Sequence, residues 1–343
     1  MNANVILAGI MLVSLVIYSV LGGADYGAGF WDLVCAGPRQ QEQRDVIAQA
    51  IQPVWETNHI WLILLVVLMF SGFPAAFSSI ALGLAVPIFF VLLGVVLRGS
   101  SFVFRAYFVG SIQTQLLWGK VFSISSSLTP VFLGIVIGAI SSDTVVTQNG
   151  ISENGFLRTW FQPFPLIVGV LSLSIFAYLS ACYLTIETRN AALQEDFRKR
   201  ALFSGFVSLI AAFATYMVAG SCAQGILHGL SDTPLAWLIE LGAAVAAIVA
   251  FAALWSRRYL RARKAAATQV ALIVIGWGVA QFPYIVRPEL TIFNSASPTN
   301  ILWDLEIAVA LGAVILVPSL TLLLHIFKTD RNSTPADTDR SAA

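Results

Sequence analysis

The sequence predicts an all-α polytopic membrane protein, and three observations support this fold class. Of the 343 residues, 58% are hydrophobic and only 11% are charged, whereas soluble domains carry about 25% charged residues. Apolar windows of roughly 20 residues recur along the chain, and each is long enough to cross a bilayer as a helix. The basic residues gather in alternate connections between these windows. The net charge of +1 gives no field that would attract nucleic acid, so no nucleic-acid partner is expected.

Nine windows are expected to form transmembrane helices, at residues 5–25, 58–79, 82–104, 116–140, 163–186, 201–223, 235–256, 267–287 and 302–327. The first lacks the basic start and small-residue cleavage site of a signal peptide, so we expect a retained helix. The break between the second and third windows is weak, and the eighth contains Gln281 and Pro283. Residues 1–327 are therefore expected to form one transmembrane domain. Residues 328–343 are expected to be a short polar cytoplasmic tail.

The basic residues predict the orientation of the chain. Seventeen of the 19 lysines and arginines fall in the connections on one side or at the window ends beside them, and only Arg158 and Arg287 fall on the other side. Cytoplasmic loops of membrane proteins carry an excess of lysine and arginine. The N-terminus is therefore expected outside and the C-terminus in the cytoplasm, which requires an odd number of spans.

Two acids are expected at the cytoplasmic boundary of neighbouring helices. Asp25 ends the first window, and Glu56 begins the second from the same side. Glu56 has two interpretations. An acid in the first turn after Pro53 complements the helix dipole, or an ionisable group at the hydrocarbon edge marks a proton path. Close to Asp25, Gly23 and Gly27 form a face of small residues that allows another helix to approach.

His59 follows Glu56 by three residues and shares its helix face. It could be a protonatable partner of Glu56, a packed interfacial histidine, or a haem ligand. Haem ligation is the least favoured, because no two histidines lie at matching depth within the membrane. The three cysteines are scattered without metal-ligand spacing, so no metal site is expected.

Four stretches together resemble subunit II of the cytochrome bd-type quinol oxidase family. They are "VLGGADYGAGF" at 20–30, "RDVIAQAIQPVWETNHIWLI" at 44–63, "LRGSSFVFR" at 97–105 and "GWGVAQFPYIVRPELTIFNSASP" at 276–298. The resemblance implies two four-helix bundles plus one peripheral helix, in the inner membrane of a bacterium. It implies a partner subunit I that carries haem b and haem d, or b-type haems only, with quinol and dioxygen as substrates of the complex. This chain would bind no haem; a bound quinone or membrane lipid, and a small single-span accessory subunit, are left open.

The resemblance also assigns roles to residues. In the family, an acid at the position matching Glu56 is part of a proposed proton path from the cytoplasm. Asp25, at similar depth, and His59, on the same helix face as Glu56, are expected to belong to that path. Residues expected at the partner interface or in structural positions are Trp55, Asn58, Trp61, Arg98, Arg105, Gln281, Pro283 and Pro288. Arg98 and Arg105 could equally be positive-inside anchors at the cytoplasmic boundary. Two family acids are missing, because Gly22 and Val103 stand in their places. The proton route is thus expected to be shorter, or to enter mainly through subunit I.

Two other functions remain open from the sequence. A secondary transporter could also have nine spans with acids at their ends, although transporters usually carry polar residues and broken helices near the midplane. The centres of these windows are almost wholly apolar, which disfavours transport. The third possibility is a purely structural membrane subunit.

Overall fold

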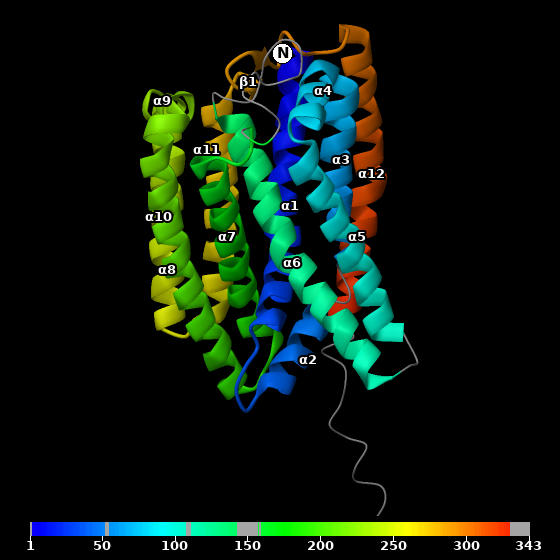
Figure 1. Ribbon diagram of the computed structural model, residues 1–343, viewed down its shortest axis with the longest axis vertical. Coiled ribbons are helices and arrows are strands. Elements are labelled where there is room, and N and C mark those ends of the chain that lie inside the picture. Colours follow the sequence, from blue (N-terminus) through cyan, green and yellow to red (C-terminus); the bar gives the residue numbers. More distant parts are fainter. Residues whose placement is uncertain (1, 52–54, 108–110, 143–156, 158, 330–343) are drawn as a thin grey trace, which may run out of the picture.

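The computed structural model describes residues 2–51, 55–107, 111–142, 157 and 159–329, and within these ranges it leaves out the side chains of residues 55–56, 105–107, 112 and 323–329. The described chain is helical apart from its connections and one short hairpin (Figure 1). This agrees with the all-α class expected from the sequence.

The described elements are α1 (Ala3–Leu33), α2 (Gln40–Ile51), α3 (Trp55–Gly72), α4 (Pro74–Gly83), α5 (Ala85–Tyr107), α6 (Ile112–Ser141), α7 (Pro163–Glu187), α8 (Ala191–Cys222), α9 (Gln224–Ser231), α10 (Pro234–Trp255), α11 (Tyr259–Gln281), β1 (Tyr284–Val286), β2 (Leu290–Thr291) and α12 (Thr299–Thr329). Strands β1 and β2 pair antiparallel. Several helices begin with proline in the first turn, as at Pro163 and Pro234, where the missing N–H costs no hydrogen bond.

Eight of the nine predicted windows coincide with a helix or a helix pair. The eighth, 267–287, is helical only to Gln281, where α11 ends, and Tyr284–Val286 forms β1. Among the described residues, seven helices are long and apolar enough to cross a membrane. The second window is split into α3 and α4, which meet at a 115° bend, and counting that pair as one span gives eight. Helix α11 occupies the eighth window but begins with a basic turn and is not among the seven. Nine crossings therefore stay a prediction.

Helix α1 lies at the centre of the bundle and contacts α3, α6, α7, α11 and α12 (Figure 1). Its glycines make this possible. A Cβ at Gly27 would overlap the carbonyl oxygen of Phe176 in α7, so only a glycine allows the two backbones to come this close. The predicted small-residue face at Gly23 and Gly27 is confirmed, and the helix that approaches it is α7.

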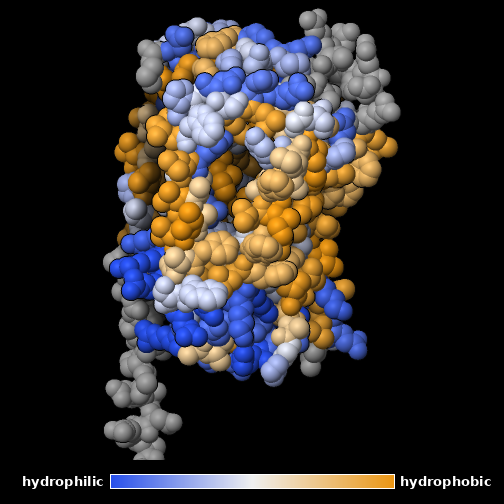
Figure 2. All heavy atoms as spheres, turned by 90° about the vertical axis from the view of Figure 1, so that its left-hand side faces the viewer, coloured by the Kyte–Doolittle hydropathy of each residue, from blue (hydrophilic) through white to orange (hydrophobic). Residues whose placement is uncertain are grey.

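The molecule has two polar ends separated by an apolar band (Figure 2). We call the end that carries α2 and the start of α6 the α2 end. The opposite end, with α4, α9 and the hairpin, is the β1 end (Figure 1). On the band, many large apolar side chains are exposed, among them Phe213 and Ile248. Exposed apolar surface of this extent is what a lipid environment requires.

Two helices extend further than the sequence predicts. Helix α1 continues to Leu33, eight residues past the expected end at Asp25, and α5 continues to Tyr107. Asp25 consequently lies about 12 Å along the helix axis from the end of α1, not at that end. Arg98 lies nine residues before the end of α5. Polar groups predicted to sit at helix ends are therefore inside the bundle.

Candidate functional site

Asp25 and Asn58 join α1 to α3 inside the bundle. The Asn58 side-chain amide donates a hydrogen bond to Oδ2 of Asp25, and both residues are buried. Because Asn58 lies two residues after Glu56, the bond places the start of α3 beside Asp25, as the sequence predicts. The side chains of Glu56 and Trp55 lie outside the described residues, so the structure gives no contact for either.

Arg98 is the largest fully buried side chain among the described residues, with 1% of its surface exposed. Its guanidinium lies 4.8 Å from the centre of the Tyr26 ring and 5.5 Å from that of Phe122. Its Nε donates to Oγ of Ser126 at 3.2 Å, whereas Nη2 has no hydrogen-bond partner. The residue is too deeply buried to be a positive-inside anchor at the membrane boundary, one of the two roles that the sequence left open. The side chain of Arg105 lies outside the described residues.

The Arg98 charge also acts on Asp25, since the two groups interact electrostatically across the α1–α5 contact. A buried carboxylate is costly unless a cation and hydrogen bonds compensate for its lost hydration. Arg98 and Asn58 each provide part of that compensation. The site is therefore a carboxylate that can be held in its charged form inside an apolar bundle.

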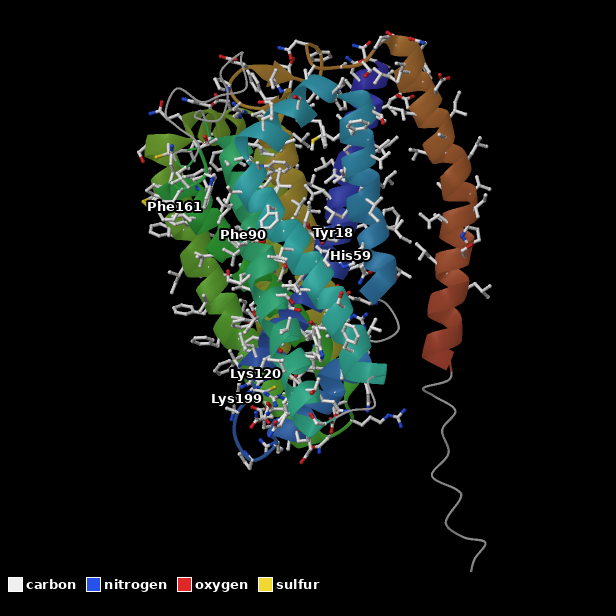
Figure 3. The ribbon with its side chains drawn as sticks, turned by 45° about the vertical axis from the view of Figure 1, so that its right-hand side comes forward. Tyr18, His59, Phe90, Lys120, Phe161 and Lys199 are labelled. Carbon is white, nitrogen blue, oxygen red and sulfur yellow. The ribbon has the colours of Figure 1, made fainter. Side chains whose placement is uncertain are left out.

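His59 lies against two tyrosines of α1. The imidazole centre is 6.1 Å from both the Tyr18 and Tyr26 ring centres, and the Tyr18 hydroxyl donates to that of Tyr26 at 3.1 Å. Figure 3 shows Tyr18 and His59 side by side, halfway along the bundle. The histidine Nδ1 is buried without a hydrogen-bond partner. Trp61 packs against the same cluster.

A second buried acid, Asp32, lies on α1 about two turns closer to the α2 end. Its Oδ2 accepts a hydrogen bond from Oγ of Ser123 on α6 at 2.6 Å, and Nε of Arg44 on α2 is 3.7 Å from Oδ1. The sequence prediction missed this residue because the first helix was expected to end at Asp25. The spacing of Asp25, Gly29 and Asp32, which places all three on one helix face, was the available signal.

A network of polar side chains ties α2 to α8 at the α2 end. Arg39 donates to Asp196 through Nε at 2.9 Å and Nη2 at 2.7 Å. Gln43 donates to Asp196 and accepts from Arg200. The hydrogen bond with Asp196 raises the pKa of Arg39, and burial raises the pKa of the Cys35 thiol in the connection before α2. These groups hold the amphipathic α2 beneath the bundle.

The Gln281–Pro298 stretch is held by bonds inside this chain. Gln281 is buried, and its amide donates to the carbonyl groups of Ile140 and Ile285. It also accepts from Nε of Arg287, whose Nη2 donates to the Ala280 carbonyl at 2.6 Å. Pro283 is half-buried, and Pro288 is exposed at the tip of the hairpin. Within the stretch, Phe282, Pro288 and Phe293 are exposed and available to contact another subunit.

The chemistry available to these groups is proton transfer. Carboxylates, hydroxyls and an imidazole can each accept and release a proton, whereas the arginine remains charged. Within the described residues, no group of three or more histidine, cysteine or acidic side chains is placed to hold a metal ion. The single histidine between two tyrosine rings does not resemble a haem-ligand pair.

Three comparisons agree with this architecture. Residues 3–327 match the family model described as cytochrome bd terminal oxidase subunit II. The chain is 24% identical over 352 residues to subunit 2 of the cytochrome bd-I ubiquinol oxidase of Escherichia coli K12, covering 92% of this chain and 90% of that protein. It is 29% identical over 127 residues to subunit 2 of the cytochrome bd ubiquinol oxidase of Bacillus subtilis strain 168, covering 37% of each. The fold matches a chain in the structure of the bd oxidase from Geobacillus thermodenitrificans with a TM-score of 0.81 and 22% identity, covering 95% of this chain and 99% of that one.

Proposed function

Because this chain belongs to the cytochrome bd terminal oxidase subunit II family, we propose that it packs against a haem-bearing subunit I and conducts protons to the site of dioxygen reduction. The membership makes it a subunit of a quinol oxidase complex with a multi-pass membrane fold. The observation that supports a proton role is the buried Asp25, which is held by Asn58 and Arg98 inside an otherwise apolar bundle.

In the proposed complex, two quinols supply four electrons and release four protons as they become two quinones. One dioxygen accepts the four electrons together with four protons from the opposite side and becomes two waters. The haems that carry these electrons are expected in subunit I. The part assigned to this chain is to receive protons at the α2 end and hold them at Asp25 and His59. We place the α2 end in the cytoplasm of a bacterium, in agreement with its excess of basic residues.

Asp25 suits this role because its environment can accommodate both protonation states. Arg98 and Asn58 stabilise the carboxylate, and the surrounding apolar side chains favour the neutral acid. Glu56 is the expected donor to Asp25, since it lies on the cytoplasmic turn that begins α3. His59 is the expected next acceptor, because it follows Asn58 directly and borders the tyrosine pair.

The first test is assembly. Co-expression with the haem-bearing subunit I should give a complex that shows a haem spectrum. That complex should consume oxygen in the presence of quinol. Purification without any haem-bearing partner would contradict the oxidase function and favour a transporter.

The second test concerns the proton route. In the assembled complex, Asp25→Asn and Glu56→Gln are each expected to lower oxygen consumption at least about tenfold, a typical loss when a proton-transferring group is removed. The double variant Glu56→Gln/His59→Phe tests whether the histidine compensates for the lost acid. Asp304→Asn, which changes an exposed acid at the β1 end, is the matched control and should keep normal turnover. Normal turnover in all variants, with intact haem spectra, would leave only a structural role.

A further inference from the structure

Asp32 is a buried acid that the proposed route through Glu56 and Asp25 does not use. Only 3% of its surface is exposed, and it lies one residue before the end of α1 at Leu33. It faces Ser123 of α6 and Arg44 of α2, and it interacts with both. A carboxylate in this position is close to water at the α2 end yet shielded from it.

Asp32 contacts both a cation and a hydroxyl. Nε of Arg44 stands 3.7 Å from Oδ1 of Asp32, and the arginine keeps 29% of its side chain exposed. The short bond at 2.6 Å comes from a hydroxyl, that of Ser123. A serine hydroxyl can accept one proton while giving up another, so it can pass a proton onward from a carboxylate.

The next polar groups along α6 lead toward Asp25. Ser126 lies one turn from Ser123 and accepts the hydrogen bond from Arg98. Gly29 of α1 allows Ser126 of α6 to come this close to α1, because a Cβ at position 29 would overlap the Ser126 side chain. Asp32, Gly29 and Asp25 share one face of α1, and the two serines line the facing side of α6.

Asp25 and Asp32 are seven residues apart, about 10 Å along the helix axis. Direct transfer is excluded at that separation, so the connection needs hydroxyls and water. The Nη2 group of Arg98 is buried without a protein partner, and buried polar groups of this kind usually bind an ordered water. Arg98 itself stays protonated, and its role is to position Ser126 and a water.

We propose that Asp32 is the carboxylate that takes up protons at the α2 end and delivers them to Asp25 through Ser123, Ser126 and bound water. In each transfer Asp32 gains one proton from the aqueous phase and returns to the carboxylate when the chain of hydroxyls has moved one proton to Asp25. The family has an acid at the position that Val103 occupies in this chain. In this proposal, Asp32 takes the place of that missing acid. The inference rests on the proposed proton role of this chain.

The test uses the assembled oxidase complex in liposomes, with oxygen consumption and the rate of proton uptake after an oxygen pulse as readouts. Asp32→Asn keeps an oxygen that can accept from Ser123 but cannot carry a proton, so both rates should fall at least about tenfold. Asp32→Glu restores a proton carrier and should recover at least about a third of the rate. The matched control, Glu42→Gln, changes an exposed acid of α2 at the same end and should stay within about twofold of the unchanged complex. A structural role would predict similar effects of Asn and Glu.

Unchanged rates in Asp32→Asn, or equal losses in Asp32→Asn and Asp32→Glu, would overturn the proposal. Ser123→Ala provides a second test if Asp32→Asn does not assemble, since it keeps the charge and removes only the hydroxyl; it should slow proton uptake several-fold, and normal uptake would again overturn the proposal. Slow turnover in Asp25→Asn together with normal turnover in Asp32→Asn would reject proton uptake through Asp32 but keep the proton role of Asp25. Normal turnover in both would reject the proton role of the chain itself.

Discussion

The Arg98 guanidinium of α5 lies 4.8 Å from the centre of the Tyr26 ring on α1, with only 1% of the arginine exposed. A cation over an aromatic face gains about 2 kcal/mol when both are desolvated. That gain, the bond to Ser126 and the nearby Asp25 together allow a full charge to reside inside an apolar bundle. The same charge fixes the position of α5 against α1 and α6.

Arg98 and Asp25 are therefore expected to be energetically coupled. Arg98→Met leaves the Asp25 carboxylate without this nearby charge and should lower the free energy of unfolding, by less than the roughly 3–5 kcal/mol lost when a buried ion pair in direct contact is broken. In the double variant Asp25→Asn/Arg98→Met, the total loss of unfolding free energy should be smaller than the sum of the two single losses. The difference, which is the coupling energy, should be about 0.5–3 kcal/mol. Chemical unfolding of the complex in mixed micelles measures Asp25→Asn, Arg98→Met and the double variant. Strictly additive losses would show that the two charges do not stabilise each other.

The close approach of α1 to α7 gives a second prediction. Gly27→Ala places a methyl group where the Phe176 carbonyl oxygen lies, and backbone cannot move aside as a flexible side chain can. Overpacking alone costs about 1–3 kcal/mol, and more is expected here. Gly9→Ala is the matched control on the same helix, because nothing lies within 4 Å of the added Cβ. We expect Gly27→Ala to reduce the yield of assembled complex and its thermal midpoint. Equal stability of the two variants would show that α1 and α7 can separate without loss.

Gln281 gives a third prediction, which concerns the local stability of the β1–β2 hairpin. Gln281→Leu removes the amide that donates to the carbonyl groups of Ile140 and Ile285. Leaving such acceptors unpaired costs about 1–3 kcal/mol. Hydrogen exchange at β1 and β2 should accelerate accordingly. Gln269→Leu is the control on the same helix, since its buried Oε1 has no partner to lose, and it should leave exchange at the hairpin unchanged.

The fold class and the positions of the helices could be predicted because long apolar windows can do little else in a bilayer. Helix ends could not be predicted as well. Asp25 and Arg98 were placed at boundaries because single charges usually mark them, yet both lie inside the bundle, where they compensate each other. That compensation depends on the contact between α1 and α5, and hydropathy along one chain carries no information about such contacts.

The candidate site was predictable only in part. The segment around Asp25 and Asn58 stood out by its resemblance to a known family, whereas Asp32, Ser123 and Ser126 did not. Serines in membrane helices commonly bond to the carbonyl of the preceding turn, as Ser125 and Ser127 do here. Ser123 also lies within hydrogen-bond distance of the Gly119 carbonyl, and only the structure shows that Ser123 and Ser126 face Asp32 and Arg98 as well. The 115° bend between α3 and α4 was likewise hidden, since both halves are apolar.

The last prediction concerns the orientation of the chain, on which the direction of proton uptake depends. In a variant in which Cys35, Cys182 and Cys222 are replaced, single cysteines are introduced as Lys199→Cys at the α2 end and Asp232→Cys at the β1 end, where both native residues are exposed. A membrane-impermeant maleimide added to intact cells should label Asp232→Cys at once. It should label Lys199→Cys only after the membrane is permeabilised, because the basic end is retained in the cytoplasm. Each variant serves as the other's control for reactivity. The reverse pattern would place Asp32 on the outer side, so that protons from the cytoplasm could not enter there.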